Sequence, residues 1–226
     1  MTDVWTVMRT ARAIRRFTHD PVHDALLATC LEAATWAPSG GNQQPWHFVV
    51  MKSPEARQAL AVGAARALAT IEDVYRLSRP APDDDSPRAR NARATFALHD
   101  GAADVPAAVL FCVKDQPMTP PLHLGASIFP AMQNFLLAAR ASGLGTCVTG
   151  WQVPAQDEFR AAIGIPDGWH LASLVIVGWP IGKHGPLRRR PLDAVASLDR
   201  WDQPLASASS PRPGVPTSSP ILGQPS

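Results

Sequence analysis

The chain has 226 residues, of which 46% are hydrophobic, enough for one globular domain with a sizeable core. Its formal net charge is only +2, so neither nucleic acid nor an anionic membrane surface is expected as a partner. The three cysteines lie far apart in apolar segments, without the spacing of a disulfide framework or a metal site. The N-terminus does not show the pattern of a secretory signal. These features predict a reduced, cytoplasmic protein.

The first half of the chain is predicted to hold helices around a single strand. A short helix is expected over residues 4–12, and Asp20-Pro21 is expected to cap and begin a second helix. The run 47–51 is β-branched and aromatic, which is typical of a strand. Ser53-Pro54 begins a third helix that should reach about Leu77. A Pro- and Asp-rich mobile loop over 78–90 and a helical piece over 90–98 follow.

The second half is predicted to alternate strands and helices. Residues 107–113 form an apolar, β-prone run that predicts a strand buried on both faces, and further strands are expected at 146–149 and 170–178. The helix over 122–142 is apolar over most of its circumference, which places it centrally or in a subunit interface. Its polar interruptions, such as His123 and Arg140, argue against a membrane span. A shorter helix is expected over 154–163.

The end of the chain differs in composition. Residues 203–226 are rich in proline and serine and contain no aromatic residue. Such a segment cannot bury enough apolar surface to offset the entropy of ordering it. We therefore expect a domain over residues 1–202 and a disordered tail over 203–226.

The segment Ala37-Pro38-Ser39-Gly40-Gly41-Asn42-Gln43-Gln44-Pro45-Trp46 joins the second predicted helix to the first strand. Its proline ends the helix, its glycines relax the backbone, and its hydroxyl and amide groups donate and accept hydrogen bonds. The segment is nearly free of charge. It is suited to a flat, neutral, hydrogen-bonding heterocycle, of which a flavin is one.

Two groups of arginines stand out in an otherwise balanced chain. Arg9, Arg12, Arg15 and Arg16 crowd the end of the first predicted helix, and residues 188–190 are Arg-Arg-Arg. Paired guanidinium groups suit a small anion such as a phosphate. Alternatively, these side chains are solvated and complement helix dipoles. Composition alone leaves both interpretations open.

Four segments in this order resemble the FMN-dependent nitroreductase family: RAIRRF, APSGGNQQPWHF, GLGTCVTGW and RRRP. The resemblance covers about residues 5–195. It implies an α+β fold with an antiparallel central sheet flanked by helices, in an interlocked homodimer with two FMN molecules at its interface. Residues 11–15 align with the family's Arg-Arg-Ser-hydrophobic-Arg motif, but alanines stand in place of the first arginine and of the serine.

The resemblance also implies which residues contact FMN. The phosphate and ribityl chain would be held near Arg12, Ala13, Arg15 and Arg16, and closed over by Arg188 and Arg190, with Arg189 as a possible third member. Thr149 and Gly150 match positions beside the flavin N5. The segment 37–46, here called the turn, would reach the flavin bound mainly by the other subunit. The residues that would line that flavin are Pro38, Ser39, Gly40, Asn42 and Gln44.

Residue patterns for other chemistries are absent. The seven histidines lack metal-ligand spacing, Gly143-Leu144-Gly145 follows a helix where a dinucleotide fingerprint needs a strand, and no nucleophile elbow occurs. We therefore expect no catalytic side chain and no metal. The cofactor would carry hydride from NAD(P)H, through N5, to a nitroaromatic, a quinone or a similar acceptor.

Two alternatives remain open. One is a specialised relative, such as a dehalogenase, a flavin-destroying enzyme or a ring oxidase. The other is a protein that binds or sequesters FMN without turnover.

Overall fold

The computed structural model describes residues 3–116 and 119–205. Its chain divides into two compact units, one formed by residues 11–183 and the other by residues 1–10 with 184–226. The larger one carries the sheet and all but one of the α-helices of the described residues.

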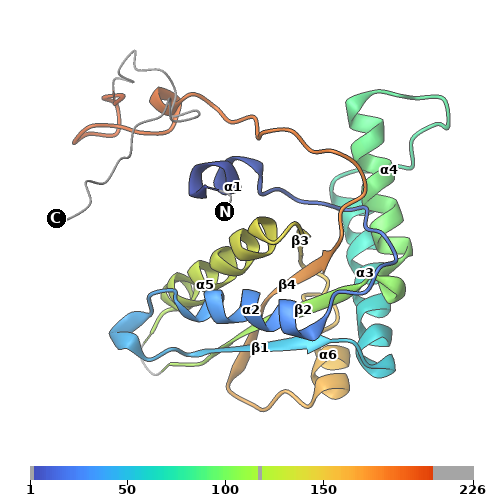
Figure 1. The fold of residues 1–226 in the computed structure, drawn as a ribbon, viewed down its shortest axis with the longest axis horizontal. Helices are drawn as coiled ribbons and strands as arrows, with labels where there is room; N and C mark the ends of the chain where they lie inside the picture. The colour runs from blue at the N-terminus through green and yellow to red at the C-terminus, as the bar shows by residue number, and fades with distance from the viewer. Residues whose placement is uncertain (1–2, 117–118, 206–226) are drawn as a thin grey trace. The chain divides into compact units, whose positions relative to one another are not determined.

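The larger unit is built on a four-stranded sheet (Figure 1). Its strands are β1 (Trp46–Met51), β2 (Ala107–Lys114), β3 (Gly145–Thr149) and β4 (Trp169–Gly178), in the order β1-β2-β4-β3. Every neighbouring pair is antiparallel, which confirms the sheet that the family resemblance implied. β1 and β3 therefore form opposite edges.

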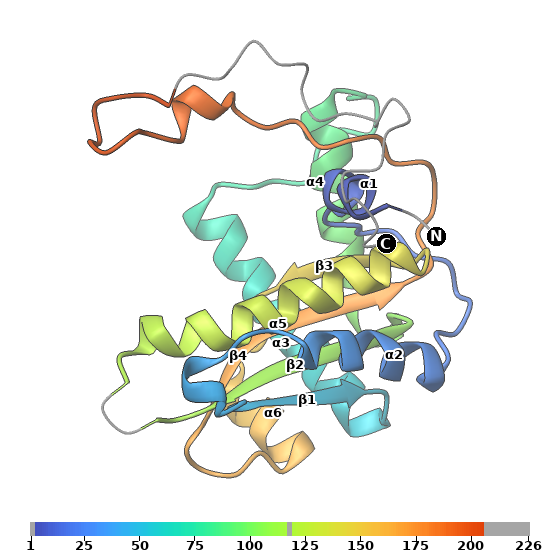
Figure 2. The same ribbon diagram turned by 60° about the vertical axis from the view of Figure 1, so that its left-hand side comes forward.

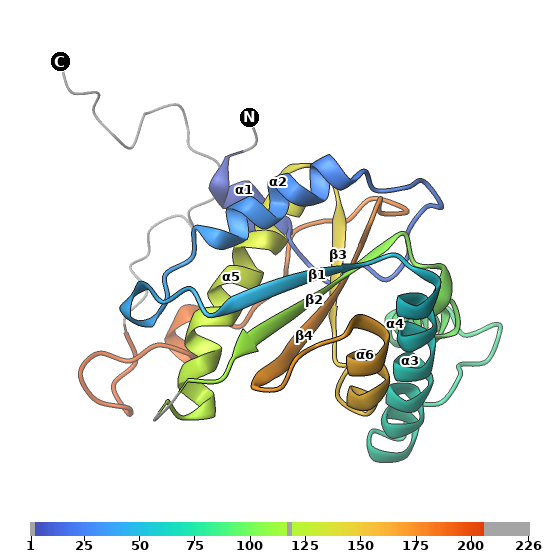
Figure 3. The ribbon, with the colours of Figure 1, turned by 90° about the horizontal axis from the view of Figure 1, so that it is seen from below.

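Helices cover both faces of this sheet (Figure 3). One face carries α2 (Asp24–Thr35) and α5 (Pro121–Ala141), which pack side by side (Figure 2). The other carries α3 (Pro54–Val74), α4 (Pro87–Asp100) and α6 (Gln156–Ile163).

Successive side chains of a strand point to opposite faces, so β2 feeds both cores. Ala108, Leu110 and Cys112 pack toward α3, whereas Val109 and Phe111 pack toward α5. The prediction of a strand buried on both faces is confirmed.

Helix boundaries depart from the prediction where local contacts compete. Asp20 does not cap α2: its carboxylate accepts a hydrogen bond from the Thr18 hydroxyl, and α2 begins four residues later, after Val22 has entered the core. Ser53 does cap α3, accepting a hydrogen bond from the Ala56 amide as the sequence suggested. α3 ends at Val74, and Arg76 then adopts a φ of 51°, which interrupts a right-handed helix.

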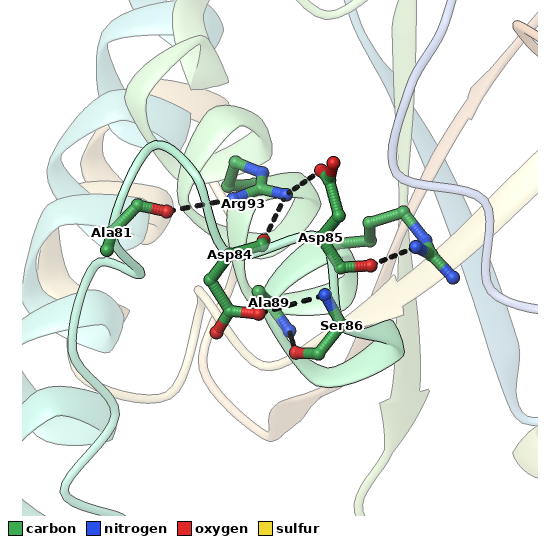
Figure 4. Close-up of polar contacts among 7 residues, drawn as sticks. Ala81, Asp84, Asp85, Ser86, Ala89 and Arg93 are labelled. Carbon is green, nitrogen blue, oxygen red and sulfur yellow. Dashed lines mark hydrogen bonds and ion pairs between the residues drawn. The ribbon is translucent and has the colours of Figure 1, made fainter.

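The connection between α3 and α4 is held by its own polar contacts (Figure 4). The Ser86 hydroxyl accepts a hydrogen bond from the Ala89 amide, so α4 begins at Pro87, earlier than the predicted helical piece. The Arg93 guanidinium donates to the carbonyl oxygens of Ala81 and Asp84, at 3.2 and 2.7 Å. The loop arginine Arg79 binds both carboxylate oxygens of Asp100, at 2.8 and 2.9 Å.

The smaller unit contains α1 (Val4–Thr10) and a short 3-10 helix, Leu192–Ala194. The Leu187 amide donates to the Arg9 carbonyl at 2.9 Å, which joins the two ends of the chain within this unit. The boundary expected at residue 202 stays a prediction, and residues 206–226 of the expected tail lie outside the described residues. Among the described helices, none combines the length and the apolarity that crossing a membrane requires.

Candidate functional site

The first predicted arginine motif lies against the edge strand β3. Ala13 forms a parallel bridge with Thr146, and the Ile14 amide donates to the Thr146 carbonyl at 2.7 Å. Ile14 is buried, and a Cβ on Gly145 would lie only 2.9 Å from its side chain. A glycine at the start of β3 is therefore what lets this segment approach so closely.

Beside this junction lies a cavity of about 480 Å³, here called the β3 pocket. Its walls come from the arginine segment, α3, α4 and the end of β3. The residues that line it are Arg15, Ala67, Thr70, Ile71, Tyr75, Thr95, Leu98, His99, Cys147, Val148, Thr149, Gly150, Trp151, Val153 and Pro154. This lining contains one guanidinium and no carboxylate, so the pocket suits a ligand with apolar and anionic or hydrogen-bond-accepting parts.

Arg15 is the cation of the β3 pocket, and a helix orients it. Its guanidinium donates to the Asn91 side-chain oxygen of α4 at 3.2 Å. Arg12 and Arg16 are exposed on the same segment, and the Arg16 carbonyl accepts a hydrogen bond from the Ile181 amide at 3.0 Å. The structure thus brings Arg15 to the pocket and fixes the backbone of its neighbours.

The end of β3 contributes the pocket's polar rim. The Thr149 hydroxyl lies 3.4 Å from the Leu174 carbonyl, and Gly150 is exposed. Trp151 is buried, and its indole Nε1 has no hydrogen-bond partner among the described residues. Burial raises the pKa of the Cys147 thiol, which keeps this lining residue neutral.

The predicted turn lies at a second cavity of about 390 Å³, here called the β1-loop pocket. Pro38, Ser39 and Gly40 line it together with residues of α5. The Ser39 hydroxyl accepts a hydrogen bond from the Gln44 amide at 2.9 Å. The Gly40 amide lies 3.4 Å from the Ser127 hydroxyl.

The middle of the turn, residues 41–44, is exposed. Gly41, Asn42 and Gln44 adopt φ values of 57°, 53° and 51°, which only glycine adopts freely. The Gln44 amide group lies 3.4 Å from the Asn42 side-chain oxygen. Both side chains are therefore presented to solvent by a turn of defined shape.

One chain does not bring the two halves of the predicted site together. The turn precedes β1, whereas Arg15, Thr149 and Gly150 lie at β3, on the opposite edge of the sheet. Three strand spacings separate those edges, or about 14 Å. Arg188 and Arg190 belong to the smaller unit, and their place at the site stays a prediction.

A model of the Nitroreductase family matches residues 8–179, well over half of the chain. The chain belongs to the nitroreductase family. By this membership it is classed as an oxidoreductase. The match includes both pockets and the complete sheet.

Individual relatives agree with this assignment. A 5,6-dimethylbenzimidazole synthase of Rhodospirillum rubrum is 31% identical over 76% of this chain and 80% of its own. An NADH dehydrogenase of Thermus thermophilus is 30% identical over 85% of this chain and 94% of its own. The crystal structure of the FMN and NADPH-dependent nitroreductase NfnB of Sphigopyxis sp. strain HMH has a TM-score of 0.67 and 24% identity, covering 88% of this chain and 100% of that one. At that identity the structural likeness shows the shared fold.

Among the polar residues that sequence reasoning did not assign to the site are Asn91, which accepts a hydrogen bond from Arg15, and the pocket-lining residues His99 and Ser127. All three lie within helices, without a motif around them. The sequence offers no signal for Asn91 or Ser127, and the only one for His99 is a titratable side chain in an otherwise alanine-rich helix.

Proposed function

We propose that this protein is an FMN-dependent oxidoreductase that passes hydride from NAD(P)H to a nitroaromatic, a quinone or a similar acceptor. The observation that carries the proposal is the β3 pocket, where Arg15 of the first motif meets Thr149 and Gly150 of the third. The family resemblance had assigned these residues to one cofactor although more than 130 positions separate Arg15 from Thr149.

The residues present fit this cofactor. The pocket volume lies within the range of roughly 300–1,000 Å³ that is usual for cofactor sites. Arg15, with Arg12 and Arg16 nearby and the Ala13 backbone, offers positive charge for a phosphate. Apolar walls and the rim of Thr149 and Gly150 suit a ring system, and bound flavin supplies the two-electron chemistry.

The protein's own residues would then bind, orient and shield the cofactor. In the proposed arrangement, Arg188 and Arg190 add charge at the phosphate. The turn of a second copy supplies Pro38, Ser39, Gly40, Asn42 and Gln44 to the ring. A second copy is needed because the turn and the β3 pocket lie at opposite sheet edges within one chain.

Exposed apolar side chains support a homodimer. Leu122 and Phe129 of α5 are 84% and 47% exposed, and Trp36, directly after α2, is 73% exposed. α2 and α5 are packed against each other, and α5 also lines the β1-loop pocket. Burying these side chains against a second copy would bring the turn to that copy's pocket.

The visible spectrum of the purified protein tests the proposal. We expect flavin absorbance after saturation with FMN, and anaerobic bleaching of that absorbance on addition of NADH or NADPH. A protein that binds FMN but is bleached by neither nucleotide would be a flavin-sequestering protein. Failure to bind FMN at saturating concentration would overturn the proposal.

One relative is named a 5,6-dimethylbenzimidazole synthase, and this similarity favours as second candidate the flavin-destroying enzyme left open above. Under air and with excess reduced FMN, that activity would release a benzimidazole detectable by mass spectrometry. The principal proposal predicts instead that FMN is recovered intact.

A further inference from the structure

His99 has a defined tautomer. It lies in the last turn of α4, and its Nδ1 is 2.8 Å from the Thr95 carbonyl oxygen. A carbonyl oxygen only accepts, so Nδ1 carries the hydrogen. The other ring nitrogen, Nε2, is then an acceptor in neutral imidazole and a donor when the ring is protonated.

The His99 ring is also held in position within the β3 pocket. It packs on the buried Trp151 ring, with 5.2 Å between centroids and 60° between planes. Among the described residues Nε2 has no hydrogen-bond partner, whereas Nδ1 is bound to the Thr95 carbonyl oxygen. His99 therefore combines a fixed ring with an available nitrogen in the pocket that also holds Arg15 and Thr149.

The charged and titratable neighbours come from several elements. Arg15 stands on the segment beside β3, Cys147 on β3, and Tyr75 directly after α3. On α4 itself, Asp100 follows His99 in sequence and is bound by Arg79. No carboxylate shares the described lining of the pocket.

We propose that His99 donates the proton that accompanies hydride transfer to the acceptor; this inference rests on the proposed function. The acceptor gains two electrons and a hydrogen as hydride from the reduced flavin. The Nε2–H bond of imidazolium breaks, and an O–H bond forms on the acceptor oxygen that has become negative. The imidazole is left neutral and takes its next proton from water.

The rest of the lining supports this choice. The hydroxyls of Thr70, Thr95 and Thr149 do not release a proton near neutral pH, and a guanidinium cannot be deprotonated in a protein. Tyrosine ordinarily titrates near pH 10, and burial disfavours ionisation of Cys147. Histidine is the side chain whose ordinary pKa lies close to neutrality.

The first test examines the ring without relying on turnover. In the FMN-loaded protein labelled with ¹⁵N-histidine, long-range proton–nitrogen spectra should show neutral His99 with hydrogen on Nδ1. The His99→Gln spectrum assigns the signal by its loss. An added phenolic analogue of the reduced acceptor should shift the Nε2 signal. A hydrogen on Nε2 in the neutral ring, or no shift at saturating analogue, would overturn the proposal.

The second test separates the two half-reactions by anaerobic stopped flow. His99→Gln should slow reoxidation of the flavin by a quinone by about 100-fold or more, the usual loss for a missing general acid. Its flavin reduction by NADH or NADPH should change less than twofold, because that step needs no such proton. His19→Gln, at an exposed position outside the pocket, is the matched control and should leave both rates unchanged.

A pH profile distinguishes proton donation from a structural role. The wild-type reoxidation rate should fall as pH rises, because less of the proton donor stays protonated, and His99→Gln should lose that dependence. Added imidazole should restore reoxidation in His99→Ala, more effectively at lower pH. An unchanged profile in His99→Gln would contradict the role of His99 alone. Absence of nicotinamide-driven bleaching in the wild type would instead contradict the proposed function, while the ring tautomer stays measurable.

Discussion

At the scale of single residues, contacts with neighbouring elements fix Arg15 and the backbone beside it. Arg15 is tied to Asn91, a residue from a helix that sequence reasoning did not connect with the site. Ile14 fixes the backbone between the two motif arginines by entering the space that Gly145 leaves open. Ile14 and Gly145 thus position the arginine segment. From composition alone, this segment could only be identified as basic.

Replacing Arg12 with alanine should weaken FMN binding. Loss of one charge-assisted contact costs about 1.5–3 kcal/mol, which corresponds to an increase in Kd of about 10- to 150-fold. Fluorescence titration of the apoprotein with FMN measures it. Arg88→Ala, which removes an exposed arginine of α4 outside the β3 pocket, is the control. Equal FMN affinity in the Arg12 variant and the wild type would show that Arg12 does not bind FMN.

Gly145→Val should displace the arginine segment from β3. Even a Cβ at this position would lie within 3.0 Å of three atoms of the Ile14 side chain. We expect reduced flavin content with the sheet retained, measured by the flavin-to-protein absorbance ratio and by far-ultraviolet circular dichroism. Full flavin content would show that the close approach is dispensable.

At the scale of elements, α3 approaches the end of β3 through a glycine. A Cβ on Gly63 would lie 2.5 Å from the Trp151 carbonyl oxygen and 2.9 Å from the Phe159 ring. Alanine normally stabilises a helix by about 1 kcal/mol relative to glycine. Here a backbone atom blocks the added methyl group, and overpacking costs roughly 1–3 kcal/mol.

We therefore expect Gly63→Ala to lower the stability of the protein, against helix propensity. A net loss of about 1–2 kcal/mol would reduce Tm by roughly 2–8 °C for a chain of this size. Calorimetry measures it, with Ala65→Ser on the exposed side of the same helix as control. A raised Tm would mean that α3 can move away from Trp151 at little cost.

The loop between α3 and α4 is held by Arg79. This side chain binds Asp100 and lies over the Phe96 ring, 4.5 Å from its centroid. Arg79 lowers the pKa of Asp100, so the ion pair is complete above the ordinary value of 3.8 and is lost as pH falls below it. The contacts of Arg79 are therefore structural, and its charge is already paired within the loop.

Arg79→Met should speed hydrogen exchange of the amides between residues 78 and 86 at pH 7. In the wild type the same exchange, corrected for its intrinsic pH dependence, should rise only as pH drops below about 4. Arg76→Met is the matched control, because Arg76 pairs with Asp73 on exposed surface at 3.5 Å. Similar exchange in both variants would mean that Arg79 does not hold the loop.

At the scale of the whole molecule, the proposed site is divided between copies. Phe129→Glu on α5 should yield a monomer by light scattering and should lose FMN, because the partner's turn is withdrawn. Val74→Glu introduces the same charge at a comparably exposed apolar position at the end of α3 and should leave the assembly intact. If Phe129→Glu stays dimeric, α5 does not form the dimer interface.

The sequence was sufficient for the strands and most helices, because alternation and helical spacing reflect burial directly. β2 and the Ser53 cap follow from such local patterns. Asp20 failed as a cap because the burial of Val22 and the Thr18 contact determine where α2 begins. The roles of His99 and Asn91 could not be predicted from the sequence. Only the packing of α4 against the arginine segment and Trp151 brings these two residues to the site.

The positions of the cysteines have a chemical consequence for a protein that handles reduced flavin. Dioxygen reacts with reduced flavins to give hydrogen peroxide, whose target in proteins is the thiolate. Cys30, Cys112 and Cys147 are all buried, and burial raises the pKa of each, that of Cys112 to about 11. Peroxide formed in the β3 pocket would therefore meet a protonated thiol at Cys147 and would find the other two thiols protonated as well, so the polypeptide would resist oxidative self-damage.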